Sequence, residues 1–279
     1  MTKNRKQKTF KKHFLSSHYL LLATLILMWF LLLHTVALAA TIYVDNQLTE
    51  VCYGTYSIAN RDCSGSDGDA YFRPQDAADV VQPGDTVYFR EGTYYQHDDM
   101  RDRIVVMNIL RNGTPDNPIT FKNYNNEEVI FSAMRPGTNG HFRALTLGIA
   151  PSSQADISGQ GVQNIVIDGL IVEGASAVGL DIYGPANRYG PEENPTENVT
   201  IRNVIARNNI DGTNSRGIST AGKLVNVVIE DCEAYNNTGP GISFWEIART
   251  WHEPEPENDM SAAQHSVIRN CLVYDNVSP

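Results

Sequence analysis

The chain has 279 residues, of which 42% are hydrophobic and 19% are charged, and its formal net charge at neutral pH is −10. An acidic chain lacks the basic face that phosphate binding requires, which excludes nucleic acid as an expected partner. An acidic protein binds an acidic polymer only through a local basic patch or a bridging cation.

The first 40 residues differ from the rest of the chain. Six Lys and Arg residues precede an uncharged apolar run at residues 19–33, and Ala37 and Ala39 frame a small-x-small cleavage site. This pattern predicts a secretory signal peptide over residues 1–40. An uncleaved membrane anchor is the alternative, because the apolar run nearly reaches spanning length. Without the leader, 16 basic residues face 32 acidic ones, a net charge of −16.

We expect residues 41–279 to form one secreted or cell-surface domain that begins with short strands and one helix. The helix is predicted over residues 72–81 and would cover an open end of the fold. In an exported protein, Cys52 and Cys63 flank a short polar loop and are expected to form a disulfide. The predicted strands of this part are residues 41–45, 86–90, 93–95, 104–110, 119–124 and 129–132.

Four similar segments recur in the second half of the chain, spaced by 34, 28 and 39 residues. Their third residues are Ile167, Ile201, Ile229 and Ile268. Their fifth residues are Gly169, Asn203, Asp231 and Asn270, all types that tolerate a left-handed backbone. Alternating apolar residues on both sides of this position indicate two short strands that meet at a corner. A repeat of this size predicts a solenoid in which each unit stacks on the next.

A third strand, beginning with Gly and an apolar residue, follows each of the first three corners. Three strands per coil predict an all-β, right-handed, single-stranded parallel β-helix with an N-terminal capping helix, its coils about 4.8 Å apart. The turn after the second strand repeats a polar pair and predicts a ladder of stacked amides. The pairs are Asn208 and Asn209, Asn236 and Asn237, and Asp275 and Asn276. Cys232 and Cys271 take the same inward position in successive coils and are expected to be free thiols.

Two segments of this chain resemble secreted proteins of the pectate lyase-like superfamily. Residues 82–94 (QPGDTVYFREGTY) look like the first segment of these β-helices, and residues 113–121 (GTPDNPITF) look like the segment that follows it. The resemblance extends over residues 41–279 and is nearest to polysaccharide lyases of the pectate lyase 9 and chondroitinase/alginate lyase types. It implies extracellular polysaccharide as the partner. The chain ends where the next strand is expected, so we expect a C-terminally truncated β-helix.

Lyases on this fold typically use Lys or Arg as the base, with Ca²⁺ or Arg at the substrate carboxylate. β-Elimination needs a base and a positive charge that stabilises the developing enolate. Lys223 is therefore the candidate base, with Arg216 and Arg249 as catalytic partners. The alternatives are a solvated turn lysine at Lys223 and, for Arg216, a loop residue that binds backbone carbonyls.

Long loops at residues 183–198 and 245–265 leave the fold on one side and would form the walls of a groove, with residues 221–226 as its floor. Aromatic and charged side chains in such a groove suit sugar binding. The substrate-binding candidates are Asp181, Arg188, Tyr189, Trp245, Trp251 and His252. Trp245 and Trp251 could instead pack the long loop onto the barrel.

Calcium is the only metal that the sequence suggests. Asp62, Asp67 and Asp69 lie in a Gly- and Ser-rich loop that could hold Ca²⁺, although a solvated turn is the better explanation of these residues. We expect a monomer that acts on polysaccharide as a uronate lyase or a lyase-like protein. The alternatives are a non-catalytic, glycan-binding surface protein and a uronate C5-epimerase, since fold alone does not decide among them.

Overall fold

The computed structural model describes residues 39–95, 105–134, 143–148, 161–184, 195–210, 212–245 and 263–277. These residues belong to one compact unit that spans Ala39–Pro279. The expected signal peptide lies outside the described residues and stays a prediction. No helix in the described ranges is long and apolar enough to cross a membrane.

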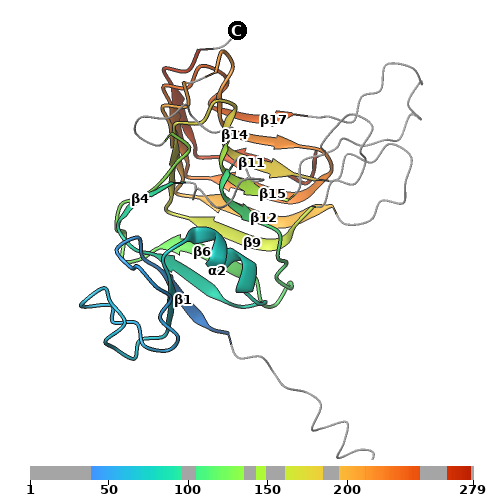
Figure 1. Ribbon diagram of the computed structural model, residues 1–279. Coiled ribbons are helices and arrows are strands. Elements are labelled where there is room, and N and C mark those ends of the chain that lie inside the picture. Colours follow the sequence, from blue (N-terminus) through green and yellow to red (C-terminus); the bar gives the residue numbers. More distant parts are fainter. Residues whose placement is uncertain are drawn as a thin grey trace, which may run out of the picture. The chain divides into compact units, whose positions relative to one another are not determined.

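The described strands form three parallel sheets (Figure 1). The first sheet contains β1 (Thr41–Val44), β2 (Asp69–Tyr71), β3 (Thr86–Phe89), β6 (Ile119–Asn123), β9 (Gln163–Asp168), β12 (Thr196–Arg202), β15 (Leu224–Glu230), β18 (Ala263–Gln264) and β19 (Val267–Arg269). The second sheet contains β4 (Gly92–Tyr95), β7 (Val129–Ser132), β10 (Ile171–Glu173), β13 (Ile205–Arg207), β16 (Glu233–Tyr235) and β20 (Leu272–Tyr274). The third sheet contains β5 (Val105–Ile109), β8 (Arg143–Leu147), β11 (Val178–Tyr183), β14 (Arg216–Ala221) and β17 (Ile242–Trp245).

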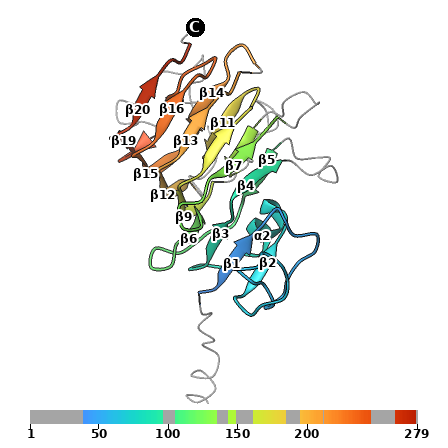
Figure 2. The same cartoon turned by 90° about the vertical axis from the view of Figure 1, so that its left-hand side faces the viewer.

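Successive coils stack in a fixed register. Ile201 of β12 pairs with Ile167 of β9 on one side and with Ile229 of β15 on the other, and all three are fully buried. Figure 2 shows the same stacking from another side, with β20 at the opposite end of the stack from β1. The predicted parallel β-helix is confirmed, because inward residues of each coil bury their apolar surface against those of the next.

The corners have the backbone conformation that the sequence indicates. The fifth residues of the four repeats have φ angles of 72° at Gly169, 53° at Asn203, 52° at Asp231 and 54° at Asn270. Each lies between a first-sheet strand and a second-sheet strand of the same coil. One left-handed residue interrupts the alternation of inward and outward side chains. The backbone therefore changes direction at a single position, and the coil needs no longer loop at this corner.

The predicted asparagine ladder is also present. Asn209 donates from Nδ2 to Oδ1 of Asn237 at 2.7 Å, and Asn237 donates from Nδ2 to Oδ1 of Asn276 at 2.7 Å. The side chains of Asn209 and Asn237 are buried, with residue exposures of 0% and 1%. A second, exposed ladder runs beside it, where Asn236 donates to Asn208 at 2.6 Å.

Helix α2 (Pro74–Val80) covers the N-terminal end of the stack, within residues 72–81 as predicted. Ala77 and Ala78 are buried in the core. Gln75 fixes the helix to β5: its Nε2 donates to the carbonyl oxygen of Asn108 at 3.0 Å, and its Oε1 accepts from the Asn108 amide at 2.8 Å. Cys52 and Cys63 form a disulfide within the preceding polar loop, and Cys232 and Cys271 are free.

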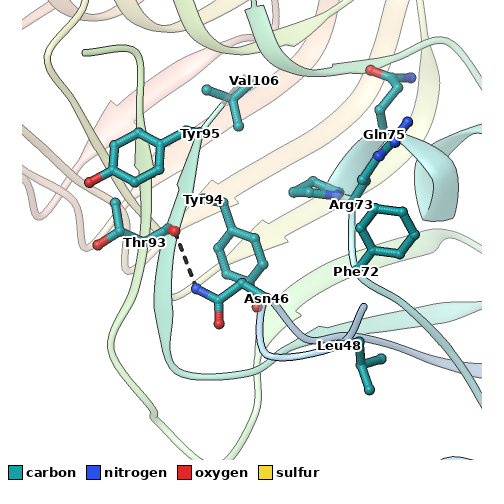
Figure 3. A pocket seen from close by; sticks show the side chains of 10 residues that line it. Asn46, Leu48, Phe72, Arg73, Gln75, Thr93, Tyr94, Tyr95 and Val106 are labelled. Carbon is teal, nitrogen blue, oxygen red and sulfur yellow. Dashed lines mark hydrogen bonds between the residues drawn. The ribbon is translucent and has the colours of Figure 1, made fainter. Parts of the chain in front are cut away.

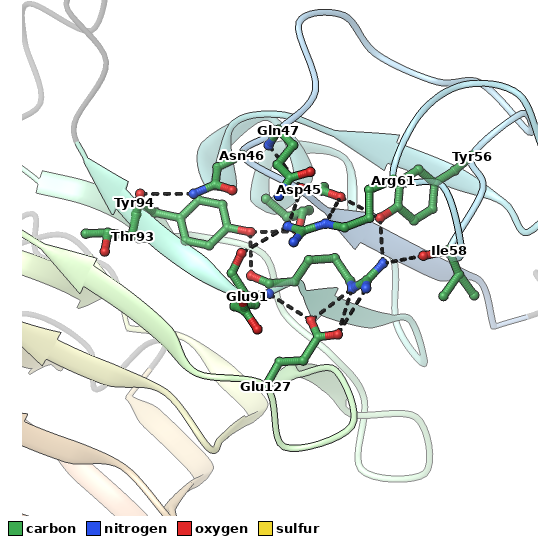
Figure 4. A network of polar contacts seen from close by, with 12 residues as sticks. Asp45, Asn46, Gln47, Tyr56, Ile58, Arg61, Glu91, Thr93, Tyr94 and Glu127 are labelled. Atoms are coloured by element: carbon green, nitrogen blue, oxygen red, sulfur yellow. Dashed lines mark hydrogen bonds and ion pairs between the residues drawn. The ribbon is translucent and has the colours of Figure 1, made fainter.

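A polar network joins that loop to the first coils (Figure 4). Arg61 donates to both carboxylate oxygens of Asp45, at 2.9 and 2.7 Å, and Tyr56 donates to the same carboxylate at 2.7 Å. Arg90 donates to the Tyr56 hydroxyl at 2.9 Å and to both oxygens of Glu127. The buried charges are therefore paired, which is the condition under which burial is tolerated.

Candidate functional site

A cavity of about 400 Å³ lies on the third sheet. It lies against strands β8, β11 and β14, which pair with one another in parallel. Among the described residues that line it, those with polar or charged side chains are Arg143, Ser176, Asp181, Tyr183, Thr213, Asn214, Arg216 and Ser219. Its volume is within the range of pockets that hold small ligands.

The register of the third sheet places these groups. Asp181 pairs with Thr146 on one side and with Ser219 on the other, and Ser219 pairs in turn with Ser243. Since Leu180 and Ile182 point into the core, Asp181 and Tyr183 share the opposite face. Thr146, Asp181, Ser219 and Ser243 therefore form a continuous polar row across the sheet.

Asp181 is bound within this row by an ion pair. Arg143 donates from Nε to Oδ2 of Asp181 at 2.6 Å and from Nη2 to the Tyr183 hydroxyl at 2.6 Å. The same guanidinium lies 5.3 Å from the centre of the Tyr183 ring. Only 4% of the Asp181 side chain is exposed. These contacts fix the orientation of the Arg143 guanidinium at the cavity wall.

Burial dominates the electrostatics of the cluster. Burial raises the pKa of Asp181, and the Arg143 guanidinium opposes that rise. Burial lowers the pKa of Arg216, while the negative charge of Asp181 acts in the opposite direction. Burial and then the Asp181 charge raise the pKa of Tyr183. With both arginines protonated and Asp181 ionised, the described charged groups that line the cavity sum to one positive charge.

This arrangement suits an anionic ligand. One arginine is committed to the Asp181 carboxylate, and a second guanidinium lines the same cavity. Guanidinium groups bind carboxylates with two parallel hydrogen bonds, and they do so best where water is partly excluded. Tyr183, Asn214 and Ser219 add groups that hydrogen-bond hydroxyls.

The structure brings two of the predicted site residues together. Arg216 and Asp181 both line the cavity, and the charge of Asp181 acts on Arg216. Lys223 lies in the turn after β14, where its carbonyl accepts a hydrogen bond from the Thr196 amide, and it is not among the described residues that line the cavity. Trp245 ends β17, and its backbone pairs with Ala221.

The remaining predicted site residues lie outside the described residues, as do residues 185–194 and 246–262 of the two loops proposed as groove walls. These site residues are Arg188, Tyr189, Arg249, Trp251 and His252. Their roles stay predictions.

The sequence predictions missed Arg143 and gave Asp181 no partner for an ion pair. Arg143 is the first residue of β8 (Arg143–Leu147), and no strand was predicted for these residues from the sequence. The alternation of Leu145 and Leu147 was a usable signal for that strand. The spacing of Asp181 and Tyr183 was a second signal, because residues two apart on a strand share a face.

The N-terminal aspartates make local hydrogen bonds. Asp67 accepts from the Ile58 amide, and Asp69 accepts from the Gly54 amide. Among the described residues, no group of three or more His, Cys, Asp or Glu side chains is arranged to hold a metal ion. Binding of Ca²⁺ stays a prediction.

Comparison with known proteins adds three findings. The family model described as Pel9A-like, right-handed β-helix region matches residues 56–278. The uncharacterized protein YwoF of Bacillus subtilis (strain 168) is 28% identical over 118 residues, which cover 42% of this chain and 22% of YwoF. The crystal structure of pectate lyase Pel9A aligns with 75% of this chain and 51% of its own, at 15% identity and a TM-score of 0.43.

The chain thus spans about half of the Pel9A structure and a smaller share of YwoF. The family match covers most of the chain, including the disulfide loop from Tyr56 onward, the capping helix and the described coils. This protein belongs to the Pel9A-like right-handed β-helix family.

Proposed function

We propose that this protein is a secreted, carbohydrate-active β-helix that acts on an acidic polysaccharide as a uronate lyase. The observation that carries the proposal is the cavity on the third sheet, where Arg216 lies beside the Arg143–Asp181 pair. An excess positive charge on an otherwise acidic protein selects a carboxylated ligand. Membership of a family named after a pectate lyase supports the same substrate class.

The chemistry follows from where charge develops. When a base removes the proton next to the sugar carboxylate, negative charge moves onto the carboxylate oxygens, and a guanidinium bound there stabilises the enolate. The electron pair then forms a carbon–carbon double bond as the bond to the glycosidic oxygen breaks. The leaving oxygen takes a proton from water, and the base releases to solvent the proton that it removed. In this proposal Arg216 binds the carboxylate, Asp181 holds Arg143 in place, and Lys223 is the base.

A glycan-binding protein without turnover is the second candidate. It is favoured by the place of Lys223, which lies after β14 and not among the described residues that line the cavity. Under this alternative, Arg216 still binds a carboxylate, but no group of the cavity removes a proton.

The test is to incubate the purified protein with pectate, alginate and chondroitin, with and without Ca²⁺, and to record the ultraviolet absorbance of the unsaturated product. The lyase proposal expects product from one polymer, and Arg216→Gln should reduce the rate by about 100-fold or more, the usual cost of removing one charge-stabilising donor. The matched control is Arg202→Gln on the first sheet, where Arg202 pairs with Asp168.

The outcomes separate the two candidates. Turnover that survives in Lys223→Ala would remove Lys223 as the base. Binding that depends on Arg216 without any product would favour the glycan-binding alternative. Equal binding and equal rates for Arg216→Gln and the wild type would refute the cavity as the site.

A further inference from the structure

A second pocket lies at the N-terminal end of the stack, away from the third-sheet cavity. Its volume is about 330 Å³, at the lower end of the range for small-ligand sites. Four segments of the chain line it: the turn after β1, the residues that lead into α2, strand β4 and strand β5. The residues that matter for its chemistry are Asn46, Phe72, Arg73, Gln75, Tyr94 and Tyr95.

The side chains are arranged as two walls and a floor (Figure 3). Tyr95 and Phe72 lie on opposite sides, with Tyr94 and Asn46 between them. The guanidinium carbon of Arg73 lies 4.7 Å from the centre of the Phe72 ring, so that the phenyl group holds the charged group in the wall. Tyr95 and Phe72 are both half-buried, which leaves part of each ring accessible.

The floor of this pocket is rigid. The single hydroxyl hydrogen of Tyr94 is shared between the carbonyl oxygens of Val44, at 2.9 Å, and of Arg90, at 2.8 Å. Tyr94 is 2% exposed, and Asn46 donates to the Thr93 carbonyl at 3.2 Å. Arg90 belongs to the polar network of Figure 4, which ties the floor to the N-terminal loop.

The helix wall is rigid as well. Gln75 is 2% exposed and is bonded in both directions to the backbone of Asn108, and its Nε2 also donates to Asp79 at 2.7 Å. The segment that carries Phe72 and Arg73 is thereby held against β5. A preformed pocket loses less conformational entropy on binding than one that must be ordered by its ligand.

We propose that this pocket is a carbohydrate-binding subsite for a carboxylated disaccharide unit. The C–H face of a sugar ring packs against Tyr95, because aromatic faces are electron-rich and attract weakly positive hydrogens. Arg73, across the pocket, takes the carboxylate, and Asn46 takes a hydroxyl. The subsite uses residues of the capping segment and the first coil, and none that line the third-sheet cavity.

The experiment titrates digalacturonate into the protein by isothermal calorimetry, in an Arg216→Gln background so that the third-sheet cavity does not contribute. We expect binding that weakens by about tenfold or more with Tyr95→Ala or Arg73→Gln, as the loss of one stacking or charged contact would produce. Two control variants should change the affinity by less than about twofold, the effect expected of surface groups that do not touch the ligand. The first is Tyr53→Ala, at a tyrosine that is 73% exposed. The second is Arg111→Gln, at an arginine that donates to the carbonyl oxygen of Asp79 in α2.

Two results would overturn the subsite. One is that digalacturonate does not bind in the Arg216→Gln background. The other is that it binds there and that neither Tyr95→Ala nor Arg73→Gln changes its affinity. Lactose serves as the neutral disaccharide, and equal affinity for lactose would overturn the assignment of Arg73 to a carboxylate. Circular dichroism checks that each variant is folded, and Arg73→Lys, which keeps the charge but not the planar fork, replaces Arg73→Gln if that variant does not fold.

Discussion

Cys232 shows how a single inward position controls the chemistry of a side chain. It is 2% exposed in the core and interacts with Cys271 of the following coil; the two cysteines directly precede strands β16 and β20, which pair with each other. Burial raises the pKa of the Cys232 thiol to about 12. At neutral pH the thiol is therefore protonated and unreactive, since the thiolate is the nucleophile.

The raised pKa predicts a pH dependence of stability. A thiol that ionises in the unfolded chain near pH 9, but only near pH 12 in the folded one, stabilises the fold fully below about pH 9 and loses that effect as the pH rises. From about pH 9 to 11, the free energy of unfolding of the wild type should fall more steeply than that of Cys232→Ala, by up to about 1.4 kcal/mol per pH unit. Urea unfolding at several pH values measures the slopes, and parallel slopes would contradict the prediction.

At the scale of the element, the asparagine ladder holds the turns between the second and third sheets in register. The side chain of Asn237 takes part in four hydrogen bonds: it accepts from the side chain and the amide of Asn209 and donates to Asn276 and to the Ala206 carbonyl. Because the site is buried, water does not replace a lost partner, and each orphaned group carries its full desolvation cost.

We expect Asn237→Ala to lower the free energy of unfolding by about 2–4 kcal/mol, because it orphans several buried groups at once. The matched control is Asn236→Gly in the exposed ladder, where φ is 53° and glycine fits the backbone. That change should cost about 0.5 kcal/mol or less, since it removes one exposed contact and introduces no strain. Chemical denaturation measures both, and equal losses for the two variants would mean that burial of the ladder is unimportant.

At the scale of the whole molecule, the solenoid depends on its covered N-terminal end. Coils of a solenoid contact only their neighbours, so an end that loosens exposes the next coil. Here α2, the disulfide loop and the Asp45–Arg61–Tyr56–Arg90–Glu127 network all meet at that end. Burial opposes ionisation of Asp45 and Glu127, but hydrogen bonds from Arg61 and Arg90 lower the pKa of both carboxyl groups overall.

Lowered pKa values predict that acid loosens this end first. The stabilisation is present above the unfolded pKa of about 4 and is lost as the pH falls through the folded pKa values. Asp45→Asn should mimic acid at neutral pH and cost about 3 kcal/mol, because it removes the buried charge that pairs with the half-buried Arg61. Hydrogen exchange should then accelerate in β1 and β3 before β12 and β15. The surface variant Asp231→Asn is the control, and uniform acceleration over all coils would argue against a local role for the network.

We expect the proposed subsite beside α2 and the third-sheet cavity to act together on one polymer. Two sites on one scaffold raise the effective concentration of a chain that reaches both. Whether the polymer reaches both sites depends on its length, so longer oligouronates provide the comparison with digalacturonate.

The sequence by itself determined the coil. The 34- and 28-residue spacings, the left-handed corner residues such as Asn203 and Asp231, and the amide ladder are all readable because they depend on local periodicity and backbone preference. The capping helix and the pairing of Cys52 with Cys63 were accessible for the same reason, since each involves residues close together in the chain.

Only the tertiary structure decided which side chains meet across coils. Arg143 and Asp181 are 38 residues apart, and Arg90 and Glu127 are 37 apart. Loops of unequal length separate such partners, so their register depends on how each coil packs onto the last and not on spacing in the sequence. The third-sheet cavity and the pocket beside α2 exist for the same reason: each is formed by residues that only the stacking of coils brings together.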